Sequence, residues 1–242
     1  KYQIKQPAFY VISFFYFLLT FLATSSPNVA IGGAGGENLN SPYVIAQTIL
    51  IMSIFGMFVV TAFVSNITLR DRDFKTSEII FSTRMKKVDY LMGRFLGAFL
   101  VAFLAFSSVA WGAMLGSLMP WLDPERLNAF SLAPYFHALF FFALPGLFFN
   151  ATLFFAVSTI TRNMMLTYTA ALTFLIMFFT GNVVFSDPEY RTILALMDPF
   201  GISSFEEETR YWTVFERNEL LAPTGGLFLY SKMIWLSFSV VL

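Results

Sequence analysis

Long apolar runs alternate with short polar segments along the chain, and the length of these runs predicts the fold. About 20 apolar residues cross a hydrocarbon core of ~30 Å as a helix that rises 1.5 Å per residue. The last run is too short to span before it ends at Leu242, and the sequence does not begin with Met, so we expect an excerpt of a longer protein. The pattern predicts an all-α polytopic membrane protein with spans at 8–25, 43–67, 95–119, 134–160, 164–184 and 231–242 onward.

Composition agrees with a membrane protein. Hydrophobic residues make up 57% of the chain and charged residues 12%, whereas an average soluble domain has about 25% charged residues. The sequence contains no cysteine, which excludes disulfides and thiolate metal sites within it. The first run lacks the small-residue exit of a signal peptide and is expected to stay in the membrane.

Basic residues gather between the second and third runs, and their distribution predicts the orientation. Residues 68–94 carry seven Lys or Arg side chains, whereas residues 26–42 carry none. By the positive-inside rule, the amino terminus and the loop 68–94 are cytoplasmic. The loop 185–230 is then extracytoplasmic, and the short segment TRN at 161–163 is a cytoplasmic hairpin turn.

The five complete runs contain no Asp, Glu, Lys or Arg between their ends. Because intramembrane charges mark proton relays and active sites, we expect neither a proton-coupled transporter nor an intramembrane protease. His137 has no second ligand nearby and is interpreted as an interfacial residue. The glycine-rich residues 31–38, IGGAGGEN, lack the Lys-Ser or Lys-Thr of a phosphate-binding loop and are interpreted as a flexible outer loop. No catalytic, cofactor-binding or metal-binding residue is therefore expected in this chain.

The segment 70–87, RDRDFKTSEIIFSTRMKK, places apolar residues in basic, cytoplasmic surroundings. Thr76 can cap a short helix over SEIIFST, whose Ile79, Ile80 and Phe81 would meet water unless something covers them. A surface offered to a partner protein is one interpretation. A basic amphipathic segment that rests on anionic lipid is the other, and the pattern alone leaves both open.

Residues 70–97, RDRDFKTSEIIFSTRMKKVDYLMGRFLG, resemble the first cytoplasmic loop of permease subunits of type 2 ABC transporters, in which a short coupling helix contacts the ATPase. Family members often have proline where this chain has Arg84, so we expect the end of the coupling helix to differ. Other segments resemble the subgroup whose permease is fused to a zinc aminopeptidase-like domain: SPYVIAQ at 41–47, MLGSLMPWLDPERLNAF at 114–130, DPFG at 198–201 and TRYWTVFERNELLAP at 209–223.

The resemblance implies a six-span permease bundle that pairs with a second permease half in the bacterial cytoplasmic membrane. It also implies cytoplasmic ATPase subunits that hold ATP and Mg²⁺, and small extracytoplasmic helices between the fifth and sixth spans. Membrane lipid is a further expected partner, and nucleic acid is not expected. The residues expected to dock on the ATPase are Arg72, Phe74, Glu78, Ile80, Phe81 and Arg84.

Two functions remain open. The first is an ATP-driven permease, expected to export, that is coupled to the ATPase through the 70–90 loop. The second is a membrane anchor or scaffold for a fused peptidase-like domain, without translocation. No motif in the sequence identifies a cargo.

Small residues form a stripe along the third run. At 100° per residue they lie within an arc of about 140°, and Phe99 and Phe103 lie off it. In lipid, helices associate by close van der Waals approach, which small residues permit. We predict that this stripe faces another helix, within the subunit or across a permease dimer. Its members are Gly93, Gly97, Ala105, Ser108, Gly112 and Gly116.

Residues 203–220 fit the small extracytoplasmic helices that the resemblance implies. Taken as one helix, they are interpreted as a cover at the membrane interface, and a solvated loop helix is the alternative. Four aromatic residues fall within about 120° of the helical wheel. They are Phe205, Tyr211, Trp212 and Phe215.

Overall fold

The computed structural model describes residues 3–26, 31–32, 35–73, 87–185 and 187–242. Within these ranges every regular element is a helix, so the all-α prediction is confirmed for the described residues. Five helical stretches are long and apolar enough to cross a membrane, which fits a multi-pass membrane protein. They are α1 (Pro7–Ser25), α2 (Pro42–Asp73), α4 (Lys87–Gly116), α5 to α6 (Ala133–Thr161) and α7 (Met164–Val184). The apolar helix α11 (Gly226–Val241) has 16 residues.

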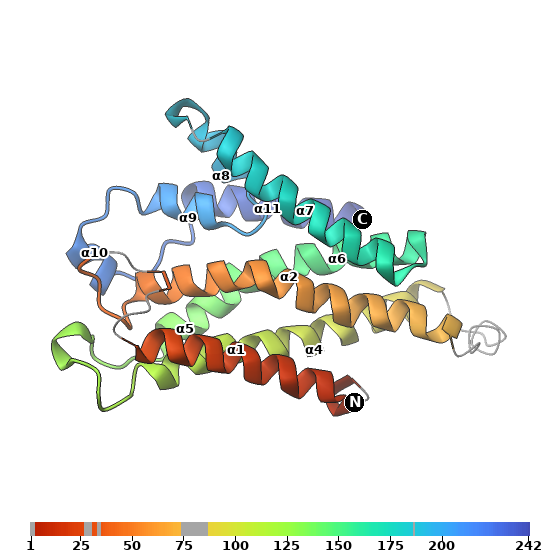
Figure 1. The fold of residues 1–242 in the computed structure, drawn as a ribbon. Helices are drawn as coiled ribbons and strands as arrows, with labels where there is room; N and C mark the ends of the chain where they lie inside the picture. The colour runs from red at the N-terminus through yellow and green to blue at the C-terminus, as the bar shows by residue number, and fades with distance from the viewer. Residues whose placement is uncertain (1–2, 27–30, 33–34, 74–86, 186) are drawn as a thin grey trace.

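Figure 1 shows the spans as a bundle with α2 in its middle. Helix α2 packs against α4, α6 and α7, while α1 packs along α4. The amino terminus and the α6–α7 turn lie at one end of the bundle, and helix α10 (Val214–Glu219) lies at the other (Figure 1). We call the second of these the α10 end.

Aromatic side chains fill the centre of the bundle around α2. Phe106, Phe142 and Phe154 are almost fully buried. Gly56 of α2 allows two of the neighbouring helices to approach closely, because a Cβ atom there would lie 2.7 Å from Leu147 and 3.0 Å from the ring of Phe106. Close packing without a side chain is therefore built into the middle of α2.

The fourth span changes its helical type near the α10 end. It begins as α5 (Ala133–His137), continues as the π-helical turn η3 (Ala138–Ala143) and becomes α6 (Leu144–Thr161). Pro145 is the second residue after this turn and has no N–H to donate to the preceding turn, so a local π-helical adjustment fits its position. Arg162 ends α6 in the left-handed conformation, with φ of 52°, and Asn163 caps α7 by accepting from the N–H groups of Met165 and Leu166.

Helices α2 and α4 are longer than the apolar runs from which they were predicted. Helix α2 continues to Asp73 and α4 begins at Lys87, so both extend into the segment 68–94 that was expected to be a loop. The two helices are joined near these ends, because the Arg94 guanidinium donates to the Ile67 carbonyl at 2.9 Å.

The chain between α7 and α11 forms several short helices, as the resemblance implies. The prediction of one helix over 203–220 is wrong, because α9 ends at Glu208 and α10 starts after Thr213, whose side chain and Glu216 form a capping box. The predicted aromatic face is also wrong: Phe205 is fully buried, whereas Tyr211 is 83% exposed. The short elements are η1 (Gln3–Lys5), η2 (Pro124–Arg126), η4 (Pro188–Tyr190), α8 (Arg191–Met197), α9 (Ile202–Glu208) and α10.

Candidate functional site

The predicted docking surface for the ATPase lies almost wholly outside the described residues. Arg72 falls in the last turn of α2, and its side chain is outside the description as well. The docking roles therefore stay predictions. The other residues of that set are Phe74, Glu78, Ile80, Phe81 and Arg84.

The stripe of small residues on α4 divides into two parts. At the α10 end, a Cβ atom on Gly112 would collide with Thr20 Oγ1 and with the Phe17 carbonyl of α1, and one on Gly116 would lie 2.9 Å from the Phe21 carbonyl. Helix α1 therefore lies directly on this part of α4.

At the opposite end of α4, no described atom lies within 4 Å of a Cβ built on Gly93 or Gly97. Between the two parts, Ala105 is fully buried and Ser108 donates to the Ala105 carbonyl at 2.7 Å. Contact of Gly93 and Gly97 with a second permease half stays a prediction.

The phenylalanines off the stripe pack on the other side of α4. The Phe99 ring meets the Phe148 ring of α6 at 5.3 Å between centroids, and the Phe103 ring meets Phe140 at 5.9 Å. Both phenylalanines are at least nine-tenths buried. Helix α4 is thus held between α1 on its small-residue side and the fourth span on its aromatic side.

A buried ion pair joins two segments at the α10 end that are far apart in sequence. Arg217 of α10 donates to Glu37 at 2.7 Å, and the Glu37 side chain is only 2% exposed. The Gly35 N–H also donates to Glu37 at 2.7 Å, and the Arg217 guanidinium lies over the Tyr43 ring at 4.8 Å. Burial raises the pKa of Glu37, but these hydrogen bonds and the Arg217 charge outweigh it and leave the pKa below its ordinary value.

Four asparagines continue this connection across three segments. The Asn38 amide donates to Asn128 Oδ1 at 2.5 Å, and its backbone N–H donates to Asn218 Oδ1 at 2.8 Å. Asn128 in turn exchanges hydrogen bonds with Asn40 and donates to the Asn218 carbonyl. We call this set the outer clasp: Glu37, Asn38, Asn40, Asn128, Arg217 and Asn218.

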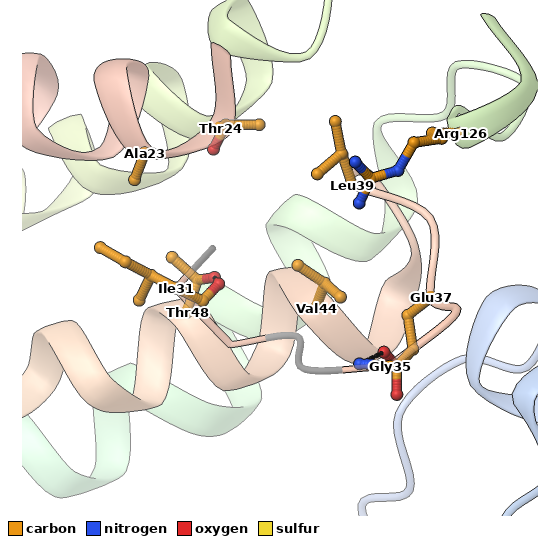
Figure 2. Close-up of a pocket in the computed structure, with 9 residues that line it drawn as sticks. All are labelled: Ala23, Thr24, Ile31, Gly35, Glu37, Leu39, Val44, Thr48 and Arg126. Carbon is orange, nitrogen blue, oxygen red and sulfur yellow. Dashed lines mark hydrogen bonds between the residues drawn. The ribbon is translucent and has the colours of Figure 1, made fainter. Parts of the chain in front are cut away.

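Figure 2 shows a small cavity beside the outer clasp, between the ends of α1 and α2 that lie toward α10 and the residues Ile31, Gly35, Glu37 and Leu39. Its volume is about 30 Å³, which holds roughly one water molecule. Thr48 donates to the Ile31 carbonyl at 2.7 Å, and Gly32 adopts a φ of 87° against Thr48. The glycine-rich segment thus uses Gly32 to turn closely over α2, and the cavity is too small for a transported solute.

A second polar cluster lies inside the bundle, where the α8–α9 turn meets α11. The Lys232 ammonium donates to the Phe200 carbonyl at 2.6 Å, and Ser231 donates to the Asp198 carbonyl at 3.1 Å. Asp198 accepts from the N–H groups of Phe200 and Ser203, and it is 1% exposed. Gly201, with φ of 89°, leaves the room that the Lys232 side chain occupies. We call Asp198 to Gly201 with Ser231 and Lys232 the Lys232 cluster.

Sequence reasoning missed both the outer clasp and the Lys232 cluster. The signals for the Lys232 cluster were present as DPFG at 198–201 and as a lysine after the start of the last apolar run. The sequence does not show which residues contact each other in these sites, because the hydrogen-bond partners lie 32 to 180 residues apart. The described residues contain no group of three or more His, Asp or Glu side chains that could hold a metal ion, and the His137 ring packs on Phe141 and Phe142.

The polytopic helical bundle is the class of structure found in membrane permeases. Residues 23–202, well over half of the chain, match the family described as ABC-2 family transporter protein. The chain belongs to this family and is a membrane-spanning permease component of an ABC transporter. No curated protein and no solved structure matches it.

Proposed function

We propose that this permease exports its cargo and is driven by cytoplasmic ATPase subunits that dock on the segment 70–90. A second permease half, as a second copy or as part of the same polypeptide, completes the path. The amino terminus is cytoplasmic, and the membrane is the bacterial cytoplasmic membrane. The ATPase subunits hold the ATP and Mg²⁺. This chain provides part of the path and the segment on which the ATPase docks.

The observation that supports this proposal is the continuity of α2. Its 32 residues correspond to roughly 48 Å at 1.5 Å per residue, which exceeds the hydrocarbon core. At one end of α2, the Arg217 guanidinium of the outer clasp lies over the Tyr43 ring. The other end of α2 leads into the proposed docking segment. A displacement of that segment is therefore transmitted along a single helix to the extracytoplasmic side.

The neighbour of α2 strengthens this mechanical connection. Helix α4 resumes the chain after the docking segment, and Arg94 ties it to the last turns of α2. Two packed helices resist bending better than one, so an ATPase that moves the segment moves both helices together. Alternating access then needs two arrangements of the spans that the ATP cycle favours in turn.

Charged substitutions in the docking segment test the proposal. Ile80→Asp and Phe81→Asp should leave membrane insertion intact and weaken ATPase binding, because each places an unpaired charge in an apolar contact. Ser82→Asp is the matched control, since it adds the same charge at a polar position. Co-purification of the ATPase with each variant gives the readout, and equal recovery from all three would show that the docking surface lies elsewhere.

The anchor function remains the second candidate, carried by the resemblance to permeases fused to a zinc aminopeptidase-like domain. It makes a different prediction for the assembled complex. If the chain is only an anchor, the positions of its helices do not depend on ATP. If it is a permease, its spans move relative to one another when ATP binds. Distance measurements between labels on the outer ends of α2 and α7, with and without ATP, separate the two functions.

A further inference from the structure

A cavity of about 170 Å³ lies between α7, α8 and the middle of α11, where Trp235 lines it. Helix α7 is inclined to the other spans, and its Val184 end lies away from them (Figure 1). Only 11% of the α7 span is buried inside the described chain, compared with 72% of the α2 span. The cavity therefore opens on the side of the permease that is least covered by its own helices.

Among the described residues, the lining presents no unpaired polar side-chain atom to the interior of this cavity. Both carboxylate oxygens of Asp198 accept backbone N–H groups. The Asn182 amide donates to the Phe178 carbonyl, and its oxygen accepts from Ser203. The indole N–H of Trp235 has no hydrogen-bond partner among the described residues, but it is buried within the protein, so the ring presents carbon atoms to the cavity. A solute that must be hydrogen-bonded gains nothing here.

The shape and wall of the cavity fit a flexible apolar chain. Phe174 and Phe178 form a rigid aromatic side, while Met177 and Met197 provide flexible thioether chains that adapt to irregular contents. No described atom lies within 4 Å of a Cβ built on Gly181, which also lines the cavity. An apolar cavity of about 150 Å³ stays dry and takes up small hydrocarbons, whereas a helix, about 10 Å across, cannot enter.

We propose that this cavity binds the acyl chain of a membrane lipid. The chain enters from the bilayer beside α7 and packs between the phenylalanines of α7 and the apolar side chains of α8. Because burial against lipid tails adds little hydrophobic drive, van der Waals contact with the aromatic wall holds the chain in place. The bound chain links α7 to α8 and thereby to the Lys232 cluster.

Photo-crosslinking of the purified permease in vesicles tests this site. The vesicles contain phosphatidylglycerol and a phosphatidylcholine whose acyl chain carries a diazirine, and labelled residues are mapped by mass spectrometry. Leu194 and Met197 should be labelled more strongly than Phe14, which is 63% exposed on α1 but does not line this cavity. Gly181→Phe fills the cavity and should abolish this excess labelling.

Val183→Phe is the matched control, because Val183 is 74% exposed on the same helix and does not line the cavity. It should keep the labelling of the unmodified permease. The proposal is overturned if Leu194 and Met197 are labelled no more than Phe14, or if Gly181→Phe labels as the control does. Cross-links from these residues to a second copy of the chain, in place of lipid, would assign the cavity to a subunit interface and also overturn it.

Discussion

The Glu37 carboxylate shows how this protein accommodates a charge that is removed from water. A buried charge is tolerated only when it is paired and hydrogen-bonded. Arg217 and the Gly35 N–H supply these partners, and the Tyr43 ring supports the guanidinium from the other side. The ion pair holds the segment before α2 against α10. Removing it should therefore loosen both segments.

Arg217→Met should destabilise the folded permease by about 3 kcal/mol, because it leaves the Glu37 carboxylate buried without its cation. Arg210→Met is the matched control: Arg210 pairs with Glu207 on the surface, with side chains 39% and 25% exposed, and such pairs contribute about 0–1 kcal/mol. Thermal unfolding in detergent gives the comparison. The double variant Glu37→Gln with Arg217→Met should be more stable than Arg217→Met alone, and the reverse order would contradict a buried unpaired charge.

The same carboxylate predicts a dependence on pH. The folded-state pKa of Glu37 is lowered from its ordinary value of 4.5, so the pair stabilises the fold above pH 4.5 and loses this effect as pH falls through the lowered pKa. The difference in unfolding temperature between the unmodified permease and Glu37→Gln should therefore be full at pH 7 and should shrink below pH 4.5. A difference that stays constant to lower pH would show that folding does not lower the pKa of Glu37.

Among the helices, α4 has a stripe of small residues that the described chain covers only in part. Its α10 end has no room for side chains at Gly112, because α1 lies against it, while Gly97 faces no described atom. Gly112→Leu should therefore separate α1 from α4 and lower both the yield and the unfolding temperature of the isolated chain. Gly97→Leu should leave both unchanged. If the two variants behave alike, the close approach of α1 does not stabilise the chain.

The α11 helix gives a second prediction at this scale. Lys232→Met should destabilise the protein by about 1–3 kcal/mol, because the buried Phe200 carbonyl loses its donor. Ser231→Ala, in the same cluster, should cost about 1 kcal/mol, since it removes one neutral hydrogen bond. Unfolding temperatures and protease sensitivity of the segment 185–225 provide the readouts. A Lys232→Met protein that is as stable as the unmodified one would show that the hydrogen bond from Lys232 to the Phe200 carbonyl does not stabilise the fold.

The helices also show which parts of the fold the sequence can predict. The spans were recognisable because twenty apolar residues have few alternatives in lipid. The extra turns of α2 and α4 were not, because charged residues such as Arg70 and Asp73 continue a helix as readily as they form a loop. The break at residues 209–213 was signalled by Thr213 and Glu216, which form a capping box. The burial of Phe205 against Tyr43 depended on tertiary contacts that no local pattern carries.

At the scale of the whole molecule, polar contacts lie mainly at the two ends of the bundle and at the Lys232 cluster. The outer clasp joins the segment before α2, the segment after α4 and helix α10. Apolar contacts along the spans can exchange partners at little cost in lipid, whereas these hydrogen bonds fix one arrangement. We therefore expect the outer ends of α2 and α4 to move as one body during transport.

A cross-link across the outer clasp tests this expectation. The chain contains no cysteine, so Asn38→Cys with Asn128→Cys introduces one defined pair where the two side chains now meet. A short bismaleimide should join them without lowering the ATP hydrolysis of the assembled complex, because the outer ends of α2 and α4 are expected to move as one body. The two single-cysteine variants, treated identically, control for modification alone. Loss of nucleotide-stimulated hydrolysis only in the cross-linked double variant would mean that the clasp opens during each cycle, and α2 and α4 would then be separate moving parts.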